Sequence, residues 1–523
     1  MDGGKTPGRR KAAFVTVAFS YGGIAFSVAK NVLLVPLYLS HFSLNAYGAW
    51  VASGGVLGML TAFDAGMSTV FLQRFGAAFG AEDRPRIGRL SGAALIVLTP
   101  LYSLLLVCGV ALAPAVIHFV RADPGDRSWI TLAFRLGTLG VAFSLAQESL
   151  LSVAFAAQRA MAAQMIRIVA QLAEILVVTG GLLLGFGIPS LGAGMAVGGL
   201  TGAALSGGYI VWLWRRLRLP RPTHDRDTMS EMLHLAPLTF VGRLAGVILG
   251  RAEPTIVSAL IGPGSAAILS LTSRAYQVGQ SLVNPIAGAL LPGMAHYVGE
   301  HGREKARPLL GDVFQLWALL TAMIIPVVFA LNRTFVALWV GPEKYAGHLV
   351  NALLLASSLV VGRVNLLGIV VGAFGRIAET TWNGLRELAV RFALMMGLLF
   401  AMGIAGAPLA TLVSVTLVSG VYLSRLIARD VDPNGNSGWA IQASGAGLLA
   451  VCVAIGVAGL ILIPQASHWL GFCTRGAVLG ATLLAVALVW GKLTRRSPIA
   501  LLRSLRGTRP ASAAASASSA GEA

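Results

Sequence analysis

Charged side chains are scarce in this chain of 523 residues, where they make up 12% of the composition. Soluble domains carry about 25% charged residues. Cysteine is also rare, and the 3 cysteines, Cys108, Cys452 and Cys473, have the spacing of neither a disulfide framework nor a metal site. What is abundant is apolar sequence, at 56% of residues and a mean hydropathy of +0.76. The composition therefore favours a membrane protein over a soluble one.

Acidic residues are half as common as basic ones, with 21 Asp and Glu against 40 Lys and Arg. The resulting net charge of +19 could indicate nucleic-acid binding. The basic residues, however, lie in short connections beside long apolar runs, where they orient membrane helices. The sequence thus predicts no nucleic-acid partner.

Catalytic and cofactor motifs are missing from the sequence as well. It contains no phosphate-binding P-loop and no HExxH metal motif. The segments between its apolar runs that would lie outside the cytoplasm are too short for an acidic catalytic site. We therefore expect no enzyme activity, no metal and no cofactor. The glycine-rich stretch 192–208 lies inside an apolar run, where Gly194, Gly198, Gly202 and Ser206 recur at i+4. That spacing predicts close helix packing.

Apolar runs of about 20 residues, the length that a bilayer-spanning helix needs, recur from end to end. They predict an all-α polytopic membrane protein of about 14 transmembrane helices. The predicted spans are 13–38, 45–70, 90–117, 129–157, 165–186, 189–214, 232–260, 264–293, 308–331, 347–375, 380–402, 406–427, 439–464 and 471–491.

Every second connection between these spans is basic. Lys and Arg cluster in the N-terminal tail, after each even-numbered span and in the C-terminal tail, whereas the other side has few, such as Arg121 and Arg333. Because basic connections stay in the cytoplasm, both termini are predicted to be cytoplasmic.

The same alternation predicts the domain organisation. Two lobes of six helices are followed by two further helices, with basic segments between and around them. The predicted segments are a cytoplasmic tail (1–12), an N-lobe (13–214), a basic linker (215–231), a C-lobe (232–427), two C-terminal helices (439–491) and a basic, then Ala/Ser-rich disordered tail (492–523).

A few charged residues lie within the spans and are not explained by orientation. A charge at mid-bilayer costs about 2.5–3.5 kcal/mol or more, so such residues should face a cavity or a partner. For four cations we expect a cavity: Lys30, Arg251, Arg274 and Arg363. Arg135 and Arg386 lie near span ends and are expected to extend to the interface, and Arg391 to pair with Glu387 four residues earlier.

The acids inside the spans leave two readings open. Glu148 and Glu174 could form internal ion pairs or take part in function. Asp64 could bind a proton or cation, or simply cap a helix. The seventh span is unusual, since Arg243, Arg251 and Glu253 precede Pro254, and a proline loosens a helix. When the chain is aligned with itself at an offset of 221 residues, Lys30 falls on Arg251, which hints at an internal repeat.

Three stretches resemble a known family. They are VPLYLSHFSLNAYGAW at Val35–Trp50, FDAGMS at Phe63–Ser68 and RAEPTIVSALIGPGSAAILSLTSRAYQ at Arg251–Gln277. The first two are similar to the start, and the third to the second lobe, of polysaccharide flippases of the multidrug/oligosaccharidyl-lipid/polysaccharide exporter superfamily. Glu253 stands at that family's acid position, whereas Ile268 replaces a frequent tyrosine.

The resemblance implies a multi-pass protein of the bacterial inner membrane, an alternating-access flippase for undecaprenyl-pyrophosphate-linked oligosaccharides. It would work in polysaccharide biosynthesis beside polymerase and chain-length proteins. Lys30, Arg251, Arg274 and Arg363 would then contact the diphosphate, and Asp64 and Glu253 would couple transport to an ion. Glu148, Glu174 and Arg243 are further cavity charges. The alternatives are a lipid II flippase, a cation-coupled multidrug exporter of the same superfamily, and a non-transporting scaffold of a glycan-assembly complex. Cations outnumber acids within the spans, which argues against the drug exporter.

Overall fold

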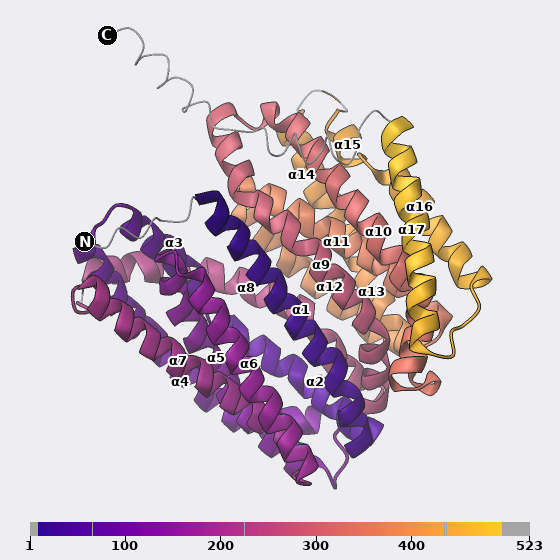
Figure 1. Ribbon diagram of the computed structural model, residues 1–523, viewed down its shortest axis with the longest axis horizontal. Coiled ribbons are helices and arrows are strands. Elements are labelled where there is room, and N and C mark those ends of the chain that lie inside the picture. Colours follow the sequence, from indigo (N-terminus) through magenta and orange to yellow (C-terminus); the bar gives the residue numbers. More distant parts are fainter. Residues whose placement is uncertain (1–8, 65, 224, 433–434, 436, 494–523) are drawn as a thin grey trace. The chain divides into compact units, whose positions relative to one another are not determined.

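Helices account for all the regular structure of the described residues in the computed structural model, which describes 9–64, 66–223, 225–432, 435 and 437–493 (Figure 1). The fourteen predicted spans lie mostly on helices, although 45–70 and 439–464 are each interrupted. Among the described residues, ten helical segments are long and apolar enough to cross a membrane, and the longest of them, Ala378–Val431, covers two predicted spans. The predicted all-α membrane fold is confirmed. Most of the two predicted tails, 1–8 and 494–523, lies outside the described residues.

The chain divides into two compact units. Unit 1 comprises Met1–Leu271 and Gly384–Ala410, and unit 2 comprises Thr272–Asn383 and Thr411–Ala523. The predicted lobes with a boundary at 215–231 stay a prediction.

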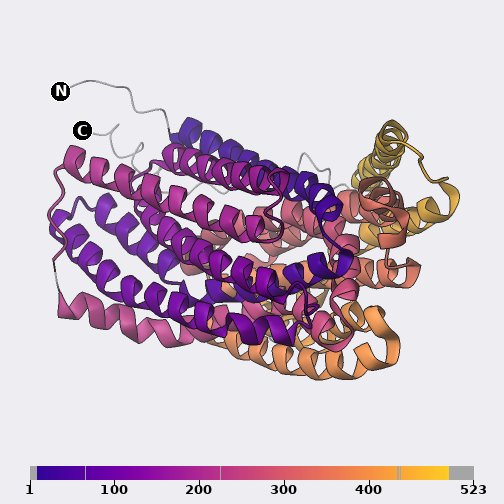
Figure 2. The same ribbon diagram turned by 90° about the horizontal axis from the view of Figure 1, so that it is seen from below.

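Unit 1 is built from long helices that run side by side (Figures 1 and 2). They are α1 (Arg9–His41), α2 (Leu44–Leu60), α3 (Met67–Gly80), α4 (Arg84–Phe119), α5 (Arg127–Ala156), α6 (Ala160–Leu183), α7 (Pro189–Leu217) and α8 (Arg226–Leu260), with most of α12 (Ile377–Met402). Caps define their ends: Ser43 Oγ accepts from the Ala46 amide at 3.1 Å, and Asp83 Oδ1 accepts from the Arg86 amide at 3.0 Å.

Unit 2 is centred on α10 (Arg307–Val340), whose inner face carries Phe314, Trp317 and Ile325. The C-terminal helices pack against α10. The other elements of unit 2 are most of α9 (Pro263–His301), α11 (His348–Ala373), part of α13 (Gly406–Ser414), the π-helical turn Val415–Gly420, α14 (Val421–Val431), α15 (Ser437–Gln442), α16 (Ala446–Leu462) and α17 (Trp469–Leu493).

The predicted span 45–70 is interrupted, whereas the proline-containing span is not. Helix α2 ends at Leu60, a 3₁₀ turn covers Thr61–Asp64, and Gly66 takes a left-handed conformation (φ 74°) before α3 begins. Helix α8 runs through Pro254 without a break. Neighbouring helices can compensate a proline in a membrane helix. The broken segment of unit 1 therefore lies at Asp64.

Candidate functional site

Close packing of glycines on α7 fixes the position of α6. A Cβ on Gly194 would lie 3.0 Å from the Glu174 carbonyl oxygen, and one on Gly198 would lie 2.8 Å from Glu174 Cβ. The packing role expected for this glycine row is confirmed. Because only glycine permits this approach, the backbone of α6 is held at Glu174.

Lys30 of α1 pairs with Glu174 of α6. Lys30 Nζ donates to Glu174 Oε2 at 2.8 Å, and the two side chains are 13% and 25% exposed. The structure thus places Glu174 in an internal ion pair. Lys30 is not a free cation here, and an anion that binds to it would have to compete with Glu174.

Glu148 of α5 also forms an ion pair, with Arg167 of α6. Arg167 Nε donates to Glu148 Oε1 at 3.1 Å, and a second contact joins the same two groups. The guanidinium also lies 5.2 Å from the ring centroid of Phe155. Arg167 lies within α6, near the start of the predicted span 165–186. Nothing in the sequence indicated this pairing between helices.

Helix α8 carries charged residues with different surroundings. Arg243 and Arg251 are exposed, and the side-chain stem of Arg251 packs on Gly58, whose Cβ would lie 3.2 Å away. Glu253 is half-buried and is attracted electrostatically by Arg391. Among the described residues, neither arginine has a carboxylate partner.

The predicted pairing of Arg391 with Glu387 is confirmed. Arg391 Nη1 also donates to the Leu249 carbonyl oxygen at 2.9 Å, which ties α12 to α8. Glu253 therefore approaches a cation that already has an acidic partner.

Asp64 lies at the helix break, and its side chain is 5% exposed. Its carboxylate accepts hydrogen bonds from Ser68 Oγ at 2.7 Å and Tyr102 OH at 3.0 Å, and Tyr102 OH lies 2.6 Å from Ser149 Oγ. The Ser68 amide also donates to it at 3.4 Å, so the expected capping is present. Within the described part of the chain this buried acid has no cationic partner. Such an acid inside a membrane is a candidate proton or cation site.

Arg363 of α11 lines a pocket of 140 Å³ inside unit 2, between α10, α11 and the segment from α15 to α16. Trp317, Gln442 and Ser444 line it too. The Trp317 indole N–H and Gln442 Oε1 are buried without a hydrogen-bond partner, and in the described part of unit 2 Arg363 has no acidic partner. Unsatisfied buried polar groups around one pocket are unusual in a native protein and suggest a polar ligand.

Arg274 of α9 also lacks an acidic partner among the described residues. Its Nη1 lies 3.5 Å from Gln277 Oε1, and its Nε is buried without a partner. Arg274 and Arg363 thus offer guanidinium donors in unit 2, while Lys30 and Arg251 belong to unit 1.

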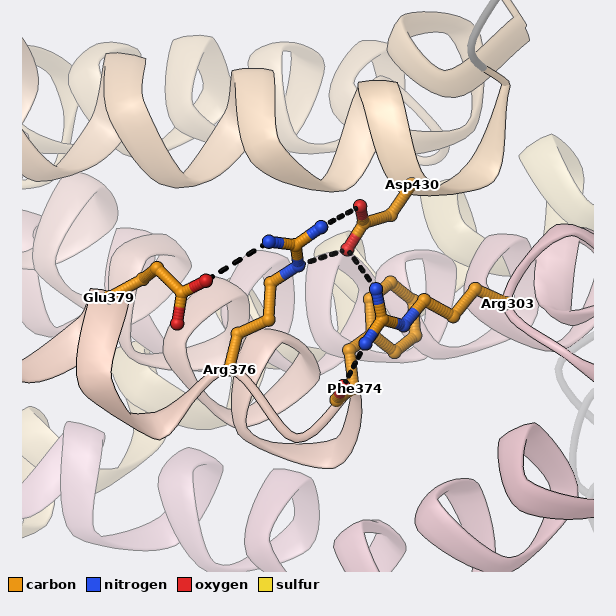
Figure 3. Close-up of polar contacts among 5 residues, drawn as sticks. All are labelled: Arg303, Phe374, Arg376, Glu379 and Asp430. Carbon is orange, nitrogen blue, oxygen red and sulfur yellow. Dashed lines mark hydrogen bonds and ion pairs between the residues drawn. The ribbon is translucent and has the colours of Figure 1, made fainter.

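Sequence reasoning missed an ion-pair cluster at the ends of α9, α11 and α14 (Figure 3). Arg376 donates to both oxygens of Asp430, at 2.7 and 2.6 Å, and to Glu379 at 3.0 Å. Arg303 Nη1 lies 3.5 Å from Asp430 Oδ2, which also accepts from Arg376 Nε. Arg303 Nη2 donates to the Phe374 carbonyl oxygen at 2.7 Å. The two carboxylates raise the pKa of the Arg376 guanidinium. Both arginines were expected only to orient spans. The signal in the sequence that could have indicated this cluster was the acidic Asp430 beside the basic Arg429.

The comparisons with known proteins agree with this arrangement of helices. Residues 93–298 match the model of a family described as polysaccharide biosynthesis protein. The family resemblance is confirmed. No curated protein sequence matches the chain.

Among solved structures, the lipid II flippase MurJ in an inward closed conformation matches with a TM-score of 0.67 at 14% identity, over 92% of this chain and 100% of that one. An inward-facing multidrug resistance transporter of the MATE family and MOP superfamily matches with a TM-score of 0.59 at 14% identity, over 79% and 96%. The chain therefore has the all-α fold shared by these transporters, and these relatives are transporters rather than enzymes.

Proposed function

We propose that this chain translocates a polyprenyl-diphosphate-linked oligosaccharide across the bacterial inner membrane by alternating access, for polysaccharide biosynthesis. The observation that carries the proposal is the pocket at Arg363. There the Arg363 guanidinium and the Trp317 indole N–H, which have no hydrogen-bond partner among the described residues, lie on two helical segments that are each long and apolar enough to span a membrane. A phosphate group can accept from both, and arginine suits phosphate geometry. The family match supports the polysaccharide cargo.

The other cations extend this picture. Arg274 and Arg251 have no acidic partner among the described residues, and Lys30 would be released if a diphosphate displaced it from Glu174. A multidrug exporter that takes cationic drugs would need unpaired acids instead. In the described structure Glu148, Glu174 and Glu387 are paired with cations. Asp64 and Glu253 form no ion pair there, but more of the cations within the spans, among them Arg251, Arg274 and Arg363, also lack one, and this excess argues against that alternative. Both termini are proposed to be cytoplasmic.

A lipid II flippase is the second candidate function, because MurJ has a similar fold and lipid II presents the same diphosphate chemistry. The two candidates differ in the group that the polyprenyl diphosphate carries. Parallel transport assays with a labelled lipid-linked oligosaccharide and with labelled lipid II, in the same proteoliposomes, would decide between them.

The proposal is tested with Arg363→Gln. We expect the variant to transport labelled lipid-linked oligosaccharide about tenfold less efficiently in proteoliposomes, the effect of losing one hydrogen bond to a charged group. Arg135→Gln is the matched control, because Arg135 is exposed and has no acidic partner among the described residues. It should transport at the wild-type rate. Equal transport by both variants, at equal amounts of reconstituted protein, would contradict the proposal.

A separate prediction concerns ion coupling by Asp64. Asp64→Asn keeps the size of the side chain and its oxygen acceptor but removes the ionisable group. We expect stimulation of transport by an imposed proton or sodium gradient to disappear, while transport without a gradient persists. Tyr102→Phe removes one hydrogen-bond donor to the carboxylate and should only weaken the stimulation. Full gradient stimulation in Asp64→Asn would exclude Asp64 from coupling.

A further inference from the structure

A second, apolar cavity of 560 Å³ lies inside unit 1 between α3, α4, α5 and α7. Its size falls in the range of ligand pockets, about 300–1,000 Å³. Apolar side chains make up most of its wall, among them Phe71, Phe75, Leu150 and Trp214. None of the residues proposed to bind the diphosphate lines it.

Three hydroxyl groups in this wall, those of Ser91, Tyr102 and Ser149, already form hydrogen bonds within the protein. Tyr102 OH donates to Asp64 and contacts Ser149 Oγ, and Ser91 Oγ donates to the Ile87 carbonyl oxygen at 2.7 Å. A ligand in the cavity therefore meets mainly carbon atoms. Such a wall favours the binding of a hydrocarbon chain, because apolar surface is stabilised in contact with other apolar groups.

The rim of the cavity includes exposed apolar side chains of α4 and α7. Leu95 is 58% exposed and Val211 is 52% exposed. Both helices are long and apolar enough to cross a membrane, so an exposed apolar rim on them faces lipid. A hydrocarbon chain can enter there from the bilayer.

One end of the cavity is basic. Arg215, near the C-terminal end of α7, lines it, and in the described structure this exposed arginine has no acidic partner. Its neighbour Arg216 instead lies 5.0 Å from the ring centroid of Trp212. No acidic residue lines the cavity. An anionic group at this end would complement the charge of Arg215.

The chain after α7 folds back and closes this end. Trp214 Nε1 donates to the Pro220 carbonyl oxygen at 2.9 Å, and the Thr223 amide donates to the Gly88 carbonyl oxygen at 3.1 Å. A Cβ on Gly92 would lie 2.1 Å from the Thr223 carbonyl oxygen. The segment 219–223, with Pro222 in the cavity wall, is thus held against α4.

We propose that this cavity binds one acyl chain of an anionic phospholipid, with the lipid phosphate at Arg215. The basic end is the end predicted to be cytoplasmic, and anionic lipids are enriched in the cytoplasmic leaflet. The lipid would fill the space between α4 and α7 and hold the segment 219–223 in place. This site is separate from the pocket at Arg363, so it stands whether or not the cargo is a lipid-linked oligosaccharide.

Two adjacent glycines of α7 allow a matched test. Gly207 lines the cavity and Gly208 does not, and a Cβ at either position would have no atom within 4 Å. Gly207→Phe therefore adds a ring to the cavity wall without a clash at its Cβ, and Gly208→Phe adds the same side chain at a position that does not line the cavity. Bound lipids are counted by native mass spectrometry of the purified full chain, after exchange into phosphatidylglycerol or phosphatidylethanolamine.

We expect wild-type protein and Gly208→Phe to retain one phosphatidylglycerol molecule more than Gly207→Phe. Arg215→Gln should bind that molecule about tenfold more weakly. Equal retention by the two phenylalanine variants would overturn the site. Equal retention of phosphatidylethanolamine and phosphatidylglycerol would overturn the anionic ligand, and so would phosphatidylglycerol binding that is unchanged in Arg215→Gln.

Discussion

Replacing Gly192 by alanine should lower the free energy of unfolding by about 3 kcal/mol, the upper part of the usual range for overpacking. Gly192 lies on α7 where it meets α5. An added Cβ would lie 2.1 Å from the Ala133 carbonyl oxygen and 2.7 Å from Ala133 Cα. These are backbone atoms, which cannot rotate away as the end of a side chain can, so the two helices must separate. A lower Tm of the purified protein in detergent, at a fixed scan rate, is the measurement.

Gly208→Ala is the control for this prediction. Gly208 is on the same helix, is exposed, and has no atom within 4 Å of a Cβ position. Because alanine is favoured over glycine inside a helix by about 1 kcal/mol, this variant should be as stable as the wild type or slightly more stable. The close packing of α5 and α7 would be refuted if both variants changed Tm by the same amount.

Asp430→Ala should destabilise unit 2 by roughly 2–3 kcal/mol, less than the loss of a fully buried ion pair because its arginine partners are partly exposed. The Asp430 side chain is 8% exposed and accepts both hydrogen bonds of the Arg376 fork, while Arg303 lies 3.5 Å away. Without the Asp430 carboxylate, the positive charges of Arg303 and Arg376 are balanced only in part, by Glu379. The expected readout is a lower Tm, with faster trypsin cleavage after Arg376.

The control here is Glu304→Ala. Glu304 is an exposed acid in the short turn before α10 and has no ion-pair partner among the described residues. The Glu304→Ala substitution removes one negative charge from unit 2, as Asp430→Ala does, but leaves the ion-pair cluster of Figure 3 intact. Comparable losses in both variants would mean that net charge, rather than the cluster, sets the stability. Asp430→Asn should fall between the wild type and Asp430→Ala, since it keeps one acceptor.

The sequence was sufficient to predict the helices, because each apolar run has the length that a bilayer imposes. It also predicted the glycine packing of α7 and the pairing of Glu387 with Arg391, since both depend on spacing within one helix. Pairs between helices, such as Glu148 with Arg167, depend on which faces meet, and periodicity in one sequence does not contain that information.

The position of the helix break was also beyond reach from the sequence. Pro254 is the usual sign of an interruption, but the helix continues through it. At the break, Gly66 takes a left-handed conformation, and the Asp64 carboxylate accepts a hydrogen bond from Tyr102 of another helix. A contact with another helix cannot be predicted from the local sequence. The diphosphate and coupling roles of the charged residues remain predictions, because they depend on cargo and ions.

The two ion pairs of α6 have a consequence for membrane insertion during synthesis. Arg167 and Glu174 are seven residues apart and so lie on one face of α6. Their partners, Glu148 and Lys30, belong to helices that leave the ribosome earlier. Complementary charges are therefore already present in unit 1 when α6 is made, and a segment with two charges can enter the bilayer against them. A chain that stops after α5 would leave Lys30 and Glu148 without these partners in the membrane.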